Sequence, residues 1–152
     1  MFAPAGLTLS GPVVRETESA DYGACRFALD GRALVFRIAK TTPTKPGQFF
    51  TLWKRASAGA PIAPLAFDDE ADFVVVASLA GLFIFDRAVL VARGVFSSAA
   101  APGKRALRIY PPASMPLASQ AIRTQQWQRP YFLALAPDGS ADPLRTRSLF
   151  GA

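Results

Sequence analysis

The chain has 152 residues, of which 51% are hydrophobic, and its mean hydropathy of +0.22 excludes a mostly disordered protein. Because it contains no histidine and one cysteine, His-based catalytic triads, His metal sites, internal disulfides and Cys-rich zinc sites are excluded. The formal net charge of +6 favours an anionic partner.

A single domain over residues 1–152 is expected from the length and the hydrophobic content. Within it, we interpret residues 1–15 as an arm and residues 136–152 as a flexible tail. The start of the chain lacks a basic stretch followed by an apolar one, and no apolar run approaches about 20 residues. We therefore expect no signal peptide, no membrane span and a cytoplasmic location.

The first two strands are predicted over residues 25–29 and 33–40, because Asp30-Gly31 between two apolar runs is a strong hairpin signal. The turn TTPTKPG then leads to a third strand over residues 48–54. Apolar runs of strand length predict further strands, over residues 72–77, 82–85 and 105–110.

Two helices are predicted in the second half of the chain. Asp86 suits a helix N-cap, and a short helix over residues 87–93 would end before Gly94. Another helix would begin with Ser119 as its cap and run to Arg129, before Pro130. Together these elements predict an α+β domain, with a mostly antiparallel sheet of five or six strands and flanking helices.

A concentration of bases lies on two predicted strands and the turn between them: Arg37, Lys40, Lys45, Lys54 and Arg55. No acid occurs from residue 31 through 67 to neutralise them. Positive charges without nearby acids create a potential that attracts phosphate groups, and lysine is a compact point charge suited to binding them. A solvated basic hairpin on the surface is the alternative interpretation.

Polar side chains accompany these bases on the strand over residues 48–54. Alternation places Gln48 on the face of Lys54, and it places Trp53 on the face of Arg55. A tryptophan beside an arginine suits base stacking next to a phosphate contact. The alternative is a tryptophan at the sheet edge that covers the core.

The later segments offer a second basic edge. On the strand over residues 105–110, Arg108 and Tyr110 alternate onto one face and Arg105 onto the other. The last predicted helix adds Arg123 on a polar surface. Among the acids, Asp72 begins a strand, where it either belongs to a site, caps the strand or pairs with a base.

Several strings of this sequence, in this order, resemble the MepB-like family of small bacterial proteins: AKTTPTKPGQFFTLWKR, DDEADFVVVAS, GLFIFDRAVLVARGVFSS, GKRALRIYPP and AIRTQQWQRPYF. The resemblance covers roughly residues 16–134. It implies a core like that of restriction endonucleases, the PD-(D/E)XK nuclease fold, and nucleic-acid binding.

The nuclease pattern that this resemblance implies is incomplete here. Lys40 occupies the position of its lysine, but Ile38 stands where a metal-binding acid is required. The preceding strand has Gly23, Ala24 and Cys25 where the pattern needs an aspartate. The resemblance therefore favours a nuclease-like cleft without a complete metal site.

We accordingly expect a protein that binds DNA, RNA or a nucleotide in a basic cleft and needs no cofactor. The expected contact residues are Lys40, Lys45, Gln48, Lys54, Arg55, Arg105, Arg108 and Arg123, with Trp53 or Tyr110 stacking on a base.

Two alternatives stay open. A phosphodiesterase dependent on Mg or Mn would use Glu18 or Asp72 together with Lys40. In a binder of a small anionic metabolite, or in a protein-interaction module, the basic residues would instead be structural.

Overall fold

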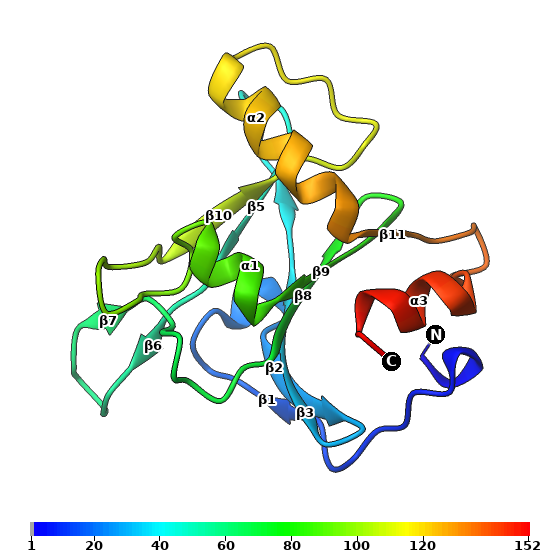
Figure 1. Cartoon of the computed structure of the whole chain (residues 1–152). Coiled ribbons are helices and arrows are strands. Elements are labelled where there is room, and N and C mark those ends of the chain that lie inside the picture. Colours follow the sequence, from blue (N-terminus) through cyan, green and yellow to red (C-terminus); the bar gives the residue numbers. More distant parts are fainter. Residues whose placement is uncertain (1) are drawn as a thin grey trace.

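A six-stranded sheet forms the centre of the protein in the computed structural model, which describes residues 2–152 (Figure 1). In spatial order its strands are β1 (Val14–Arg15), β2 (Cys25–Leu29), β3 (Arg32–Ile38), β8 (Phe73–Ser78), β9 (Gly81–Asp86) and β11 (Phe132–Ala134). Strands β3 and β8 are parallel, and all other neighbours in this sheet are antiparallel.

The predicted hairpin joins β2 and β3. Asp30 has a φ of 48° and Gly31 a φ of 77°, and the register pairs Leu29 with Arg32. Positive φ at both central positions is what a two-residue hairpin loop of type I′ requires, and Asp-Gly tolerates it. The prediction from the sequence is confirmed at this point.

Two smaller sheets lie beside the central one. Their strands are β4 (Lys40–Thr41), β5 (Gln48–Thr51) and β10 (Ala106–Ile109) in the order β10-β5-β4, and the pair β6 (Lys54–Arg55) and β7 (Ile62–Ala63). The strand predicted over residues 33–40 is therefore divided, because Ile38 ends β3 and Lys40 begins β4 in another sheet. The strand predicted over residues 48–54 is likewise interrupted after Thr51.

The helices are α1 (Arg87–Ala92), α2 (Ser119–Gln128) and α3 (Pro143–Leu149), with short 3-10 turns η1 (Ala3–Ala5), η2 (Ala20–Tyr22) and η3 (Arg129–Tyr131). Asp86 caps α1 as predicted, since its carboxylate accepts from the backbone N–H of Val89. The predicted cap at Ser119 is wrong, because Ser119 is the first helical residue and Ala118 precedes it without a side-chain cap. Within residues 2–152, no helix has the length and apolarity needed to cross a bilayer.

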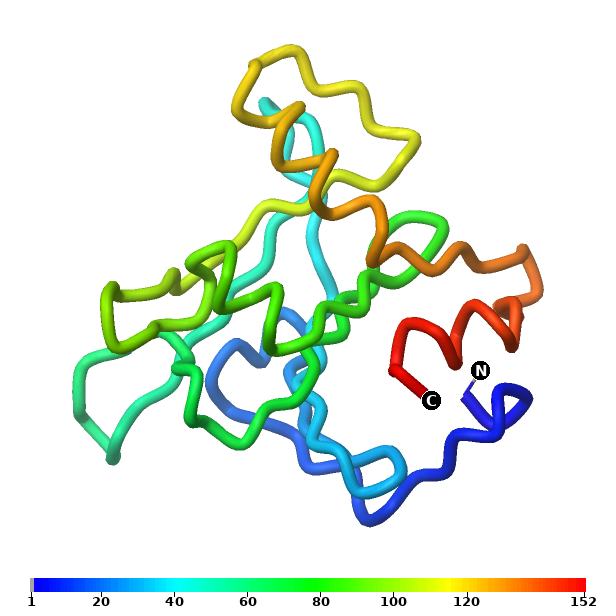
Figure 2. The backbone as a smooth tube through the Cα atoms, viewed as in Figure 1, coloured from blue at the N-terminus to red at the C-terminus, as the bar shows by residue number. Residues whose placement is uncertain are grey.

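Other segments of the chain lie on both faces of the central sheet (Figures 1 and 2). Each face packs against them through an apolar core. On one face, Val74 and Val76 pack with Phe50 of β5 and Leu90 of α1. On the other, Val75 and its neighbours pack with the two ends of the chain. The sheet is therefore the middle layer of three, and strands β4, β5 and β10 belong to the first outer layer.

The two ends of the chain form the other outer layer. Ala5, Leu7 and Phe150 are buried, and η1 packs beside α3, so both termini lie close together (Figure 1). This packing differs from the flexible arm and tail expected from the sequence. The difference arises because Leu7 and Phe150 are far apart in the sequence, and the core that they share forms only when the chain folds.

Candidate functional site

Two of the expected contact residues are neutralised by acids. Lys54 Nζ lies 2.7 Å from the carboxylate of Asp69, and Arg55 Nε lies 2.7 Å from that of Glu18. The expectation that no acid neutralises these bases is therefore wrong for both. The acids come from segments outside residues 31–67, which a count along the chain does not associate with these strands.

Trp53 is also held by Glu18. Its indole Nε1 donates to Glu18 Oε2 at 2.7 Å, while Arg55 donates to the other carboxylate oxygen. These hydrogen bonds hold the pKa of Glu18 below its usual value. Glu18 thus fixes the Trp53 ring and the Arg55 side chain in place, and the ring is half-buried.

Lys40, by contrast, projects from an open face of the small sheet. The register aligns Lys40 of β4 with Phe49 of β5, and Phe49 with Arg108 of β10, so these three side chains share one face. Lys40 Nζ lies 4.5 Å from the ring centre of Tyr22. The Arg108 guanidinium carbon lies 5.8 Å from that of Phe49.

The two rings of this face lie between the two cations. The ring centres of Tyr22 and Phe49 are 6.2 Å apart in an edge-to-face arrangement. Both rings are half-buried, and Lys40 beside them is exposed. We call Lys40, Tyr22, Phe49 and Arg108 the aromatic row. It combines positive charge with ring surface, which is the composition of many single-strand binding surfaces.

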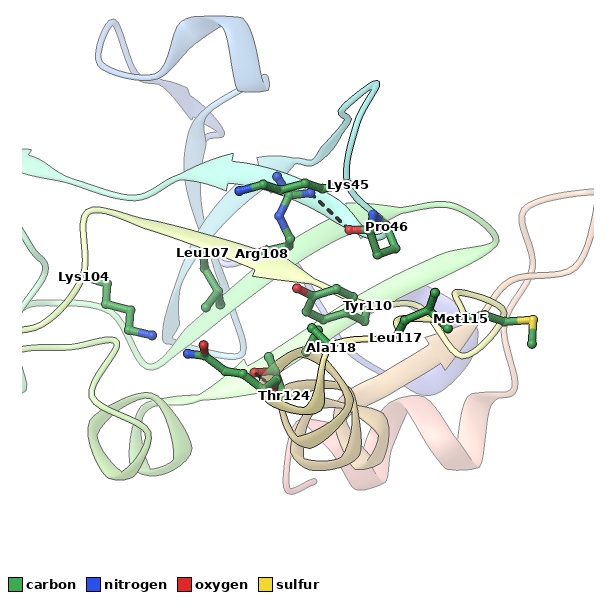
Figure 3. A pocket seen from close by; sticks show the side chains of 12 residues that line it. Lys45, Pro46, Lys104, Leu107, Arg108, Tyr110, Met115, Leu117, Ala118 and Thr124 are labelled. Carbon is green, nitrogen blue, oxygen red and sulfur yellow. Dashed lines mark hydrogen bonds between the residues drawn. The ribbon is translucent and has the colours of Figure 1, made fainter.

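Arg108 connects this row to a groove on the neighbouring surface. Its Nη1 donates to Thr42 Oγ1 at 3.0 Å and to the carbonyl oxygen of Pro46 at 3.3 Å. The turn between β4 and β5 is thereby attached to β10, and Lys45 beside Pro46 is brought to the rim of the groove (Figure 3). The cation of Arg108 remains without an acid partner in residues 2–152.

The groove lies between β10 and α2 and has a volume of about 700 Å³. Strand β10 and the residues before it contribute Lys104, Leu107 and Tyr110, while Ala118 and Thr124 line the side of α2 (Figure 3). No acidic side chain lines it. The bases at its wall are Lys45, Lys104 and Arg108.

Tyr110 and Gly47 fix the shape of this groove at the turn. Gly47 has a φ of 80°, and a Cβ atom there would lie 2.5 Å from the carbonyl oxygen of Ile109 and 2.7 Å from the Tyr110 ring. A glycine is therefore required for the turn to approach β10 so closely. Tyr110 is largely buried by this contact, so its ring is a wall of the groove and offers little free face for stacking.

A buried glutamine completes the β10 edge. The Gln128 side chain accepts from the backbone N–H of Tyr110 at 2.9 Å and donates to the carbonyl of Arg108 at 3.0 Å. It thereby replaces a neighbouring strand along the free edge of β10. This pairing joins α2 to the strand and sets the width of the groove between them.

The family model described as MepB-like matches residues 16–134, which include every residue that lines the groove. The chain belongs to the MepB-like family. A solved structure described as the crystal structure of MepB is 33% identical, with a TM-score of 0.74, and the match covers 81% of this chain and 85% of that chain. Among curated proteins we found no match.

The acids expected for a metal site of the nuclease type are distributed over this MepB-like domain. Asp72 accepts from the backbone N–H of Ala33 at 2.8 Å and pairs with Arg87 at 3.1 Å. Asp72 therefore lies at the start of β3, whereas Lys40 follows the end of this strand. A strand of 7 residues spans roughly 20 Å at the usual rise per residue. Across residues 2–152, no group of three acidic or cysteine side chains is placed to hold a metal ion.

The other residues expected to contact the ligand lie outside the groove. Gln48 is buried, and its side chain accepts from the backbone N–H of Leu79, so it connects β5 to the turn after β8. Arg105 and Arg123 are exposed, but neither lines the groove. The structure thus brings together Lys45, Arg108 and Tyr110 of the expected set, and it places Lys40 on the adjoining face.

Three residues of this surface were absent from the expected contact set: Tyr22, Phe49 and Lys104. Phe49 lies next to Gln48 on a predicted strand, and its alternation with Thr51 was the available signal. Tyr22 belongs to η2, a 3-10 turn, and reaches Phe49 only through tertiary packing. No pattern along the chain relates Tyr22 to this face.

Proposed function

We propose that this protein binds nucleic acid or a nucleotide through the groove between β10 and α2 and the adjoining aromatic row. The observation that supports it best is the set of Lys45, Lys104 and Arg108 on one groove whose lining contains no acid. Phosphate groups are the ligands that such a concentration of unpaired cations favours.

The aromatic row supplies the second component of the proposed interface. Phosphates would contact Lys40 and Arg108, and the half-buried rings of Tyr22 and Phe49 would contact bases or sugars between them. These rings take the stacking role that the sequence predicts for Trp53 or Tyr110. Arg105 and Arg123 are exposed and follow or precede lining residues of the groove in the sequence, so they would add long-range attraction.

The proposal retains the restriction-endonuclease-like core that the family resemblance implies, and the cytoplasmic location expected from the sequence without a signal peptide or membrane span. It includes no metal and no cofactor. The metal-dependent alternative gains no support from the positions of its residues, because Glu18 is occupied by Trp53 and Arg55 and Asp72 lies far from Lys40. We therefore prefer binding without cleavage.

Fluorescence anisotropy with labelled single- and double-stranded oligonucleotides tests this proposal. The samples would contain low or physiological salt, with or without Mg or Mn, and would afterwards be examined on a gel. Binding that weakens with salt and leaves the oligonucleotide intact is the expected result. Metal-dependent shortening would favour a phosphodiesterase, and saturable binding of a mononucleotide alone would favour a metabolite site. Absence of binding at low salt would contradict the proposal.

A further inference from the structure

The loop between β10 and α2 holds two large apolar side chains in solvent. Met115 is 84% exposed and Leu117 is 92% exposed, the highest values for large hydrophobic residues within residues 2–152. Removal of such side chains from water is favourable, so folding gains little from leaving both exposed. A partner that covered both side chains would remove them from water, and this burial would stabilise the complex.

The same loop is held in a defined shape. Gln125, a buried residue of α2, donates from Nε2 to the carbonyl oxygens of Pro111 at 3.0 Å and Ser114 at 2.8 Å. The N–H of Ser114 also donates to the Pro111 carbonyl at 2.8 Å. Proline at positions 111, 112 and 116 restricts the backbone further. A loop ordered before binding loses little conformational entropy when a partner arrives.

Met115 and Leu117 line the groove that also contains Lys45, Lys104 and Arg108 (Figure 3). Lys104 lies toward one end of the groove in this view, and the two apolar side chains lie toward the other. The groove therefore offers cations along part of its length and apolar contacts at one end. A nucleic acid has the complementary composition, because anionic phosphates alternate along it with bases whose faces are apolar.

We propose that residues 111–118 form a wedge loop, which places Met115 and Leu117 against unstacked bases while Lys45, Lys104 and Arg108 hold the adjacent phosphates. The proposal rests on nucleic-acid binding in the groove, and it specifies the ligand as a single strand or a locally opened duplex. Exposed methionine and leucine side chains are among those that separate base steps in protein–DNA complexes.

A lipid surface is the other partner that combines negative charge with apolar material. Its shape fits less well, because the headgroup plane is flat whereas Arg108 and Lys104 line a recessed groove of about 700 Å³. An extended strand of nucleic acid can enter such a groove. Shape thus favours a nucleic acid over a membrane.

Two oligonucleotides of equal length and charge test the wedge, one with all its bases and one with abasic sites throughout its centre. The wild-type protein is expected to bind the base-bearing strand at least about fivefold more tightly. The double substitution Met115→Ser and Leu117→Ser should reduce this preference to the part that Tyr22 and Phe49 supply, without changing affinity for the abasic strand. Leu144→Ser, which alters an exposed leucine on α3, should leave both affinities unchanged.

The possible results distinguish failure of the wedge-loop proposal from failure of nucleic-acid binding in the groove. Retention of the full wild-type preference by the double variant would overturn the wedge and leave groove binding intact. If the wild-type protein bound neither strand, groove binding and the wedge would both fail. Binding to phosphatidylserine vesicles that requires Met115 and Leu117, without any preference between strands, would assign the loop to a membrane instead. Circular dichroism would verify that the exposed substitutions preserve the fold.

Discussion

Lys54 Nζ lies 2.9 and 2.7 Å from the two carboxylate oxygens of Asp69. Asp69 also accepts from the backbone N–H of Ala66, so the pair attaches β6 to the segment before β8. This contact assigns Lys54 to the stability of the fold. Lys45, the neighbouring lysine in the sequence, has no acid partner in the part of the chain that the structure describes.

Lys45→Ala and Lys54→Ala form a matched pair, since each removes one lysine and one positive charge. We expect Lys45→Ala to weaken oligonucleotide affinity by about threefold or more at low salt, because a phosphate contact is lost. Lys54→Ala should leave affinity close to that of the wild type and lower the free energy of unfolding by about 1 kcal/mol or less. Equal losses of affinity in anisotropy titrations would show that net charge alone governs binding.

The Asp69 carboxylate predicts a pH dependence of stability. Partial burial would raise its pKa, but hydrogen bonds from Lys54 and the Ala66 N–H outweigh this, and the pKa lies below its usual value. A lowered pKa in the folded state stabilises the protein at pH values above the unfolded-state pKa of 3.8. That contribution is lost as the pH falls through the lower folded-state pKa.

Urea unfolding of the wild type and of Asp69→Asn would measure this effect. The wild type should be the more stable protein at pH 7 and at pH about 5, and the difference should shrink below pH about 4. Asp68→Asn, which changes an exposed neighbour, serves as the control. A difference that stays constant down to pH about 2 would contradict the assignment of this contact.

Arg37 and Arg26 both pair with Glu16, but only Arg37 is fully buried. Burial lowers the pKa of Arg37, and Glu16 opposes that change. Arg37 Nε also donates to the Thr51 carbonyl at 3.0 Å, which joins β3 to β5. We expect Arg37→Ala to reduce the free energy of unfolding by about 3 kcal/mol and Arg26→Ala by about 1 kcal/mol or less, measured by urea denaturation. Similar costs for both would contradict a structural role for the buried guanidinium.

Gln128 provides a separate test of how β10 is held. Gln128→Leu would leave the Tyr110 N–H and the Arg108 carbonyl unpaired at a buried edge, at an expected cost of about 1–3 kcal/mol. Gln126→Ala, an exposed substitution on the same helix, should change stability by less than about 0.5 kcal/mol. Thermal unfolding of both variants would decide; a neutral Gln128→Leu would mean that α2 is held to β10 by other contacts.

Patterns among residues that are neighbours in the sequence predicted much of this fold correctly. The Asp30-Gly31 hairpin and the Asp86 cap depend on neighbours along the chain, and the structure contains both. The division of the strand before Lys40 was not predictable in the same way. Alternation continues through Ala39, whereas the change of sheet depends on pairing with β5, which lies further along the chain.

The candidate site was predictable only in part, for the same reason. Lys45 and Arg108 are close because β5 pairs with β10, and charge composition alone identified both as candidates. Charge composition wrongly predicted that Arg55 is unpaired, because its partner Glu18 is 37 residues away in the sequence. Which bases remain unpaired is decided by long-range contacts, and these are not visible in a local pattern.

The dependence of oligonucleotide affinity on salt is the most direct test of the proposed interface. We predict a negative slope of log K against log[salt] for the wild type, reduced by about 2 to 3 in the triple variant Lys45→Ala, Lys104→Ala and Arg108→Ala. Lys54→Ala should keep the wild-type slope. An unchanged slope in the folded triple variant would contradict the account, because phosphates would then be bound elsewhere on the protein.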